Sequence, residues 1–484
     1  MTTAFSAHAG RTTLAALVPL LLFVSGSCDS DSVQPSSGSR LAARDEDLSR
    51  NDNPVIRWAD IARREMVDPG PIIDSRAFAI LFAAIHDAVN GVDPHFTAYS
   101  VKLGAPHASL DAAVAAAAHD VLVTLSPSRR EQIEAAYQAE LAEVRDSAAR
   151  ARGVELGQQA AKANLERRAG DGIPIGPWPP TEGQITQPVY QPTGLPGNYA
   201  FTPPFDAPPL GPIALFPGWG RLTPFMARLG RHRAPGPLPL KSARYAADLD
   251  SVRRIGSFTS AIRTEDQTEI ARFWFEEFTT WDQIAIDAVR RHRLDPWRAA
   301  RVLAQVHFAM ADAGIACFKA KYRFATWRPF TAIRQADRDG NPATAPDSGW
   351  VPLLWSEPGE LPPRFFIPPI PEYPSAAATI SAAAAAVLIR HFGDREEFEA
   401  VSVSLPGVTR HYSSFTEAAR ENGMSRVYGG IHFLHAVQDG YQLGRGIGRE
   451  VSEGLGARRG QRVGLRVPRA LRRLRDRLAW NPAP

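Results

Sequence analysis

The chain has 484 residues, of which 44% are apolar and 22% charged, a composition typical of a globular protein with a large core. The net charge is +4, but residues 457–484 contain nine Arg and one Asp, so the basic excess belongs to this tail. Only two cysteines occur, Cys28 and Cys317, which excludes a disulfide framework and a cysteine zinc site. No nucleic-acid reading module accompanies the basic tail, so nucleic acid is not an expected partner.

The first residues are typical of an export signal. Arg11 precedes an apolar stretch over residues 14–24 that is too short to span a bilayer comfortably. We therefore predict a signal peptide over residues 1–28 and an exported protein. Two alternatives stay open. Cys28 is either the lipidated residue of a bacterial lipoprotein, attached to a membrane surface, or part of a plain secretion signal, because Ser25 stands where lipoprotein sites usually have leucine.

Helical spacing of apolar residues begins after a disordered linker, which we predict over residues 29–52 because they are rich in Ser, Asp and Arg. Positions i, i+3, i+4 and i+7 recur on one face of each segment. The expected helices are 74–85, 110–125 and a more charged one that begins near Ser128 and continues past Asp146.

A long irregular connection follows between Gly170 and Pro224, where prolines recur every few residues. Two interpretations are open. The loop either covers an active-site mouth or wraps the surface and packs Trp178, Tyr190 and Phe201 onto helices.

Helices resume near Ser242 and carry the rest of the chain. Thr264 and Gln267 form a capping box, and Asp295-Pro296 begins a helix that runs toward Lys321. Hardly any segment alternates with period two. We predict an all-α domain over residues 53–452, a helical bundle assembly that includes the long Pro-rich loop. A basic Arg-rich tail follows over residues 453–484.

Three segments in the last third of the chain supply the cations Lys321, Arg328 and Arg426, the hydroxyl of Ser375 and the imidazole of His432. They are residues 321–329 (KYRFATWRP), 374–377 (PSAA) and 425–432 (SRVYGGIH). Phosphate and vanadate bind guanidinium and ammonium groups through their oxygens, and a neutral imidazole nitrogen can bond the central atom. Any one of these segments alone has an ordinary structural explanation, such as a solvated helix end.

Ser375 precedes a strong helix former, residues 376–388, and occupies its N-cap position. Free amides at the start of that helix attract an anion, and the hydroxyl adds one hydrogen bond. The alternative is simply a capped, buried helix. Gly440, Gly444 and Gly448, at four-residue spacing, predict that another helix packs closely against its small side chains.

The three segments resemble the signature of the vanadium-dependent haloperoxidases, whose site is shared with the type 2 phosphatidic acid phosphatase and acid phosphatase superfamily. That signature is Lys, six residues, Arg-Pro; then Pro-Ser-Gly-His; then Ser-Arg, five residues, His. Segments around Asp87, Trp274 and Asp439 are similar to the soluble bacterial branch, and the likeness covers roughly residues 54–450.

The resemblance implies two four-helix-bundle-like halves with vanadate held between helices, and phosphate as a competing occupant. By motif position Lys321, Arg328, Ser375 and Arg426 would bind the oxygens, and His432 would bond vanadium as axial ligand. Lys321 would also polarise peroxide.

The chain departs from this pattern at Ala377, where the family has a histidine that moves protons. Its loss should slow turnover by about 10²- to 10⁴-fold while sparing oxyanion affinity. His435, three residues after His432, is a candidate catalytic substitute on the same side of a helix, with an ordinary packed or capping histidine as the alternative. His391 and His411 have weaker claims.

Three functions are consistent with these residues. The first is a vanadate-dependent haloperoxidase, impaired at Ala377, that uses hydrogen peroxide to oxidise bromide or iodide rather than chloride, with a halide or a small organic molecule as acceptor. The second is an acid phosphatase that forms a phosphohistidine on His432. The third is a noncatalytic exported protein that binds phosphate or vanadate.

Overall fold

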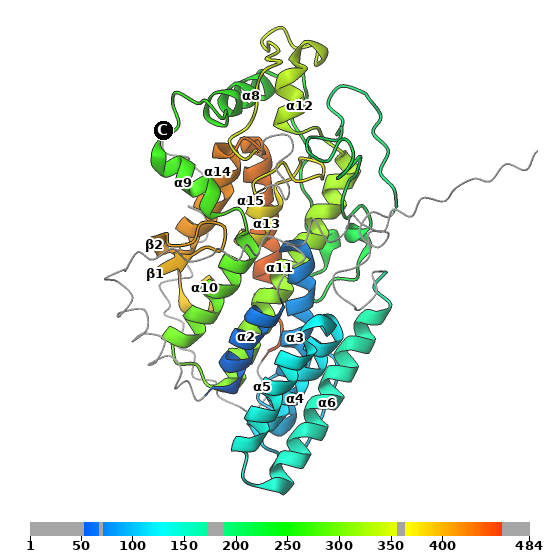
Figure 1. The fold of residues 1–484 in the computed structure, drawn as a ribbon, viewed down its shortest axis with the longest axis vertical. Helices are drawn as coiled ribbons and strands as arrows, with labels where there is room; N and C mark the ends of the chain where they lie inside the picture. Colours follow the sequence, from blue (N-terminus) through cyan, green and yellow to red (C-terminus); the bar gives the residue numbers. More distant parts are fainter. Residues whose placement is uncertain (1–52, 67–70, 173–187, 356–363, 457–484) are drawn as a thin grey trace, which may run out of the picture.

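The computed structural model describes residues 53–66, 71–172, 188–355 and 364–456. In this part of the chain thirteen α-helices and one two-stranded sheet form the fold, so the all-α prediction is confirmed (Figure 1). The predicted signal peptide, linker and Arg-rich tail lie outside the described residues, apart from residues 453–456. Among the described helices, none combines the length and the apolar character that a membrane span requires.

The first group of helices fills the lower half of the view in Figure 1 and includes α4, α5 and α6. These helices are α2 (Pro54–Glu65), α3 (Pro71–Val92), α4 (Leu110–Leu125), α5 (Arg130–Glu143) and α6 (Ser147–Ala169). The helix expected to continue past Asp146 is in fact two, because Asp146 caps the amides of Ala148 and Ala149 and starts α6 afresh.

The remaining helices include those that carry the motif residues. They are α8 (Ala243–Ile255), α9 (Glu265–Phe273), α10 (Glu277–Arg291), α11 (Pro296–Phe324), α12 (Pro329–Arg334), α13 (Ala376–Phe392), α14 (Phe415–Tyr428) and α15 (Leu434–Ser452). In Figure 1 α8, α9, α12 and α14 lie in the upper half, while α10 and α11 extend down beside α2 and α3. The predicted capping box of Thr264 and Gln267 is confirmed at α9, and Asp295 caps α11. The hairpin of β1 (Arg395–Val401) and β2 (Thr409–Ser414) is an addition that the sequence pattern did not predict.

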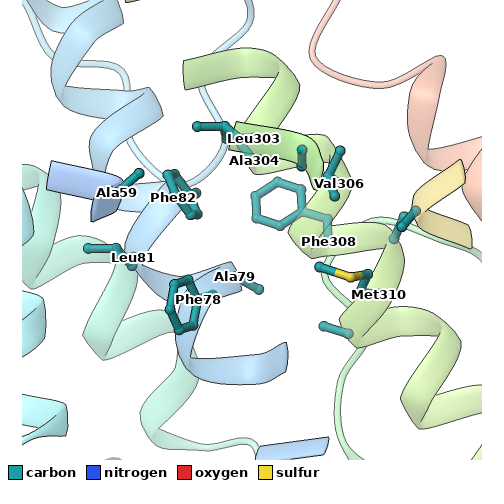
Figure 2. Packing of buried hydrophobic residues seen from close by; sticks show 14 of the residues in the cluster. Ala59, Phe78, Ala79, Leu81, Phe82, Leu303, Ala304, Val306, Phe308 and Met310 are labelled. Carbon is teal, nitrogen blue, oxygen red and sulfur yellow. The ribbon is translucent and has the colours of Figure 1, made fainter. Parts of the chain in front are cut away.

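The long helix α11 joins the two halves, because it packs on α3 at one side and on α13 and α15 at the other. Apolar side chains of α2, α3 and α11 face one another in this core (Figure 2). Phe78, Phe82 and Phe308 are all buried there. Burial of this interface fixes the axis of α11, and therefore the position of its last turn, where Lys321 lies.

The Pro-rich connection is irregular over its described residues, as predicted, and it packs on α11. The Tyr190 ring meets Tyr322 with 5.8 Å between ring centroids, which confirms packing onto a helix for this residue. The Phe201 ring meets the ring of Tyr190, with 6.3 Å between centroids, and Trp178 lies outside the described residues. A short bridge also pairs Asn198 with Thr326, so the loop holds the chain just before Arg328. That the Pro-rich connection covers the mouth of an active site stays a prediction.

Candidate active site

Lys321 and Arg328 lie on either side of a sharp change in chain direction. Lys321 is in the last turn of α11, and Ala325 ends this helix in the left-handed region with φ 45°. Arg328 is the N-cap residue of α12, with Pro329 at its first position. Both side chains are 0% exposed. Burial lowers the pKa of Lys321 to about 7 and that of Arg328 to about 10, so Arg328 remains charged at neutral pH.

A proline-rich segment over residues 368–372, here called the proline strap, supplies the partners of both cations. Lys321 Nζ donates to the carbonyls of Pro371 at 2.8 Å and Glu372 at 2.9 Å. Arg328 donates from Nε to Ile370 O at 2.8 Å and from Nη2 to Pro368 O at 3.1 Å. Proline has no backbone N–H, so the strap cannot pair as a strand and its carbonyls remain available to accept from side chains.

Ser375 follows the strap and is the N-cap of α13, as predicted. Its Oγ accepts from the amide of Ala378, and the side chain is fully buried. The amides of Ala376 and Ala377 belong to the first helical turn and have no carbonyl within the helix to pair with. Ala377 itself is 4% exposed, so the position where the family has histidine is a buried one.

The close packing of α15 on α13 is confirmed at the three glycines. A Cβ added at Gly444 would lie 1.8 Å from Thr379 O, one at Gly448 2.3 Å from Ala383 O, and one at Gly440 2.7 Å from Ser375 O. Only glycine permits this approach. The backbone of Ser375 is thereby held against α15, where its N–H donates to Ala436 O at 3.0 Å.

Arg426 reaches the site from the last turn of α14. Its Nη2 donates to Glu277 Oε2 at 2.7 Å and to the carbonyls of Trp274 and Phe275, and the side chain is 4% exposed. The Nε atom is also buried and makes no hydrogen bond with the described residues. This donor is therefore available for a bound group.

His432 lies in the short connection between α14 and α15 and is hydrogen-bonded through both ring nitrogens. Nδ1 is 2.8 Å from Glu372 Oε1, and Nε2 is 3.1 Å from Arg328 Nη1. Because Arg328 can only donate, Nε2 accepts and the proton of the neutral ring is on Nδ1. Burial and the charges of Arg328, Lys321 and Arg426 hold the pKa of His432 well below its ordinary value, so the imidazole is neutral.

His435 occupies a different environment from the one its spacing predicted. Since α15 begins at Leu434, His432 precedes the helix, and the expectation that both histidines share one helix side is wrong. Nδ1 of His435 pairs with Asp248 Oδ2 at 2.7 Å, while Nε2 is buried without a hydrogen bond to the described residues. Burial would lower the pKa of His435, but the hydrogen bond to Asp248 and the charge of Glu372 raise it.

The two weaker histidine candidates lie elsewhere. His391 is in the last turn of α13, roughly 24 Å along the helix from Ser375 at about 1.5 Å per residue, and it bonds Gln305. His411 is on β2, with its side chain 72% exposed. The structure therefore brings Lys321, Arg328 and Arg426 close to His432, places Ser375 at the start of α13, and leaves these two histidines out.

The charges of this cluster do not cancel. When Lys321 is protonated, Lys321, Arg328 and Arg426 carry three positive charges, against which lie two buried carboxylates, Glu277 and Glu372. A buried excess of one positive charge is costly unless an anion balances it. Together with the orphan Nε of Arg426, the first-turn amides of α13 and the lone pair of His432 Nε2, this donor set fits a tetrahedral oxyanion such as vanadate or phosphate.

Three acidic residues of this environment, Glu277, Glu372 and Asp248, were missed in the sequence. Glu372 is the one that a local signal could have revealed, because it stands three residues before Ser375 as the only carboxylate in the Pro-rich run of residues 365–375. Glu277 and Asp248 carry no such signal. Their role depends on Arg426 and His435, which are distant in the sequence.

The fold and the site together define a helical-bundle protein with a buried cationic cluster around one neutral imidazole. Residues 301–458 match the family model described as the VCPO second helical-bundle domain. Vanadium chloroperoxidase from Curvularia inaequalis is 25% identical over 476 residues, which covers 75% of this chain and 74% of that protein.

Solved structures of vanadium-dependent haloperoxidases have a similar fold. A bacterial vanadium-dependent iodoperoxidase superposes with a TM-score of 0.66 at 24% identity, covering 88% of this chain and 99% of its own. The holo-type structure of a bacterial vanadium-dependent chloroperoxidase gives a TM-score of 0.64 at 19% identity, covering 80% and 92%. The resemblance to the vanadium-dependent haloperoxidase family is confirmed by these matches, and the family model of the second helical-bundle domain matches residues 301–458.

Proposed function

We propose that this protein is an exported, vanadate-dependent haloperoxidase that uses hydrogen peroxide to oxidise bromide or iodide in preference to chloride. The observation that carries the proposal is the convergence of three buried cations on a neutral His432 whose Nε2 holds a lone pair. Lys321, Arg328, Ser375 and Arg426 would bind the oxygens of vanadate, and His432 its central atom. When bound, vanadate supplies Lewis-acid activation of peroxide without a change of oxidation state.

The residues of the site have distinct tasks. The strap carbonyls hold Lys321 and Arg328 in place, and Glu277 fixes the guanidinium of Arg426. Lys321, with a pKa of about 7, is the cation best able to exchange a proton near neutral pH and to polarise peroxide. Burial of the whole cluster excludes water and strengthens each of these interactions.

The site lacks an acid–base group at residue 377 to deliver a proton to the reaction. Oxidation of one halide by one peroxide consumes one proton and yields hypohalous acid and water. Ala377 cannot supply this proton, because its side chain is a methyl group. His435 is our candidate for a catalytic substitute, since its pKa is raised and its buried Nε2 has no hydrogen-bond partner among the described residues. We expect slow turnover, and therefore a preference for the more easily oxidised halides.

Phosphoric-monoester hydrolysis is the second candidate function. It is favoured by the same neutral imidazole, because an unprotonated Nε2 beside Arg328 is suited to attack phosphorus and form a phosphohistidine. The third candidate, a noncatalytic binder of phosphate or vanadate, is favoured by Ala377. Export of the protein, with or without lipid on Cys28, remains our inference from the first 28 residues.

One experiment separates the three candidates. The purified protein is incubated with bromide, peroxide and added vanadate, and in parallel with a phosphate monoester. Bromide oxidation that depends on vanadate supports the first function, and phosphate release supports the second. Tight vanadate binding by calorimetry without either activity would establish the third and overturn the haloperoxidase proposal.

A further inference from the structure

Glu372 contacts His432 through a single oxygen that also accepts a backbone hydrogen bond. Oε1 is 2.8 Å from His432 Nδ1 and 3.0 Å from the amide nitrogen of Phe433, and the side chain is 1% exposed. The amide of Phe433 can only donate. Oε1 therefore accepts from Phe433. Because Nε2 of His432 accepts from Arg328, the proton of the neutral ring is on Nδ1, and Oε1 accepts from the imidazole as well.

The pKa of Glu372 is raised, because the charges around it only partly offset the effect of burial. Burial raises the pKa of Glu372, whereas the charges of His435, Lys321 and Arg328 act to lower it. Tyr373 follows Glu372 in the chain, and Phe433 follows His432. The His435 ring stacks on both, with 5.6 Å and 5.8 Å between ring centroids.

Carboxylates and imidazoles therefore alternate through the protein interior, in the order Asp248, His435, Glu372 and His432. Asp248 holds His435 at one end through Nδ1, and Glu372 holds His432 at the other through the same ring atom. A carboxylate that accepts from one ring nitrogen fixes the tautomer and raises the basicity of the other nitrogen.

We propose that Glu372 is a positioning residue that holds His432 as the Nδ1–H tautomer, with the Nε2 lone pair directed to the oxyanion site. The proposal rests on the proposed function, because the same Nε2 would bond the central atom of vanadate. Glu372 acts through His432 rather than on the oxyanion itself.

The first test needs no bound anion. In ¹⁵N-histidine spectra of the anion-free protein, with the His432 signals assigned by their loss in His432→Gln, we expect a proton on Nδ1 and none on Nε2. The Nδ1–H proton resonance should lie far downfield, because its acceptor is charged, and should move upfield in Glu372→Gln. A proton on Nε2 in the wild-type protein would overturn the proposal.

The second test measures the consequence for binding. Glu372→Gln should weaken vanadate binding by about tenfold to a hundredfold in calorimetry, the usual effect of losing such a partner. Glu396→Gln is the matched control, since Glu396 pairs with His292 at 2.9 Å on β1, away from the site, and should leave binding unchanged. Equal affinities for the wild-type protein and Glu372→Gln would also overturn the proposal.

The two tests separate failure of the inference from failure of the function. If the wild-type protein binds no vanadate, the proposed function fails, while the tautomer of His432 and its response to Glu372→Gln still decide the positioning role. Thermal melting of each variant identifies any loss of folding, and in that case the wild-type spectrum alone decides.

Discussion

Arg328 Nη1 donates to His432 Nε2 across 3.1 Å, so the ring nitrogen best suited to bond an oxyanion already has a partner. The remaining guanidinium contacts go to the proline strap and to Ile431 O. Binding of a tetrahedral anion would therefore require Nη1 to leave the imidazole and donate to an oxygen instead. The strap keeps the rest of the guanidinium in place during this exchange.

Arg328→Lys should consequently weaken vanadate binding although the charge is kept. An ammonium group cannot hold the strap carbonyls and reach the anion together, and a lost charged hydrogen bond costs about 1.5–3 kcal/mol. We expect a loss of roughly tenfold to a hundredfold in calorimetry. Arg334→Lys is the control, because Arg334 lies on the same helix and contacts Trp350 O outside the site. Equal vanadate affinity of Arg328→Lys and the wild type would contradict the prediction that one guanidinium group binds the strap carbonyls and the anion together.

Ala377→His should raise whichever activity the protein has, because it restores an acid–base group beside the N-cap of α13. A general acid typically contributes about 10²- to 10⁴-fold, and we expect a gain at the lower end of this range since the position is buried. Initial rates of bromide oxidation and of phosphate release measure the gain. Ala376→His, one residue earlier and partly exposed, should give none. A folded, vanadate-binding Ala377→His without any gain would argue against a retained mechanism.

Anion binding should be accompanied by proton uptake at Lys321. Burial lowers its pKa to about 7 from 10.5, so between these values the unfolded chain holds a proton that the folded chain lacks, and stability rises with pH. A bound dianion raises the pKa of Lys321 again, so the folded protein takes up the proton that Lys321 had lost. Calorimetry with molybdate at about pH 8.5, in buffers of different ionisation enthalpy, should show uptake approaching one proton. Binding without uptake in the wild type, or equal uptake in Lys321→Met, would exclude Lys321 as the group that titrates.

Gly444→Ala should destabilise the fold and disturb the site together. The added methyl group would lie 1.8 Å from Thr379 O, so α15 must move away from α13 at a cost of about 1–3 kcal/mol or more. Urea unfolding measures the loss, and vanadate affinity should fall because Ser375 lies on the same interface of α13 and α15, against Gly440. In Gly446→Ala the nearest atom is 3.0 Å away on the side chain of His232 rather than on the backbone, so we expect a smaller loss of stability than in Gly444→Ala. Equal stability of both variants would contradict the close contact.

Local patterns in the sequence determined most of the helices and the identity of the cationic residues. Apolar spacing and capping residues act within a few positions, and for this reason α4, the start of α11 and the cap at Ser375 were predicted correctly. The β1–β2 hairpin was not predicted, because apolar and polar residues do not clearly alternate in its strands. The break at Asp146 was not predicted either, because the sequence around it keeps its helical propensity.

Only the tertiary structure decided how the charges of the site are satisfied. Glu372 reaches His432 across 60 positions in the chain, and Glu277 reaches Arg426 across 149. It also showed that His432 precedes α15 and that His435 turns to Asp248. The physical reason is that a carboxylate or an imidazole has no fixed role of its own. Its protonation and its contacts depend on which groups burial brings within a few ångströms, and no local pattern records that distance.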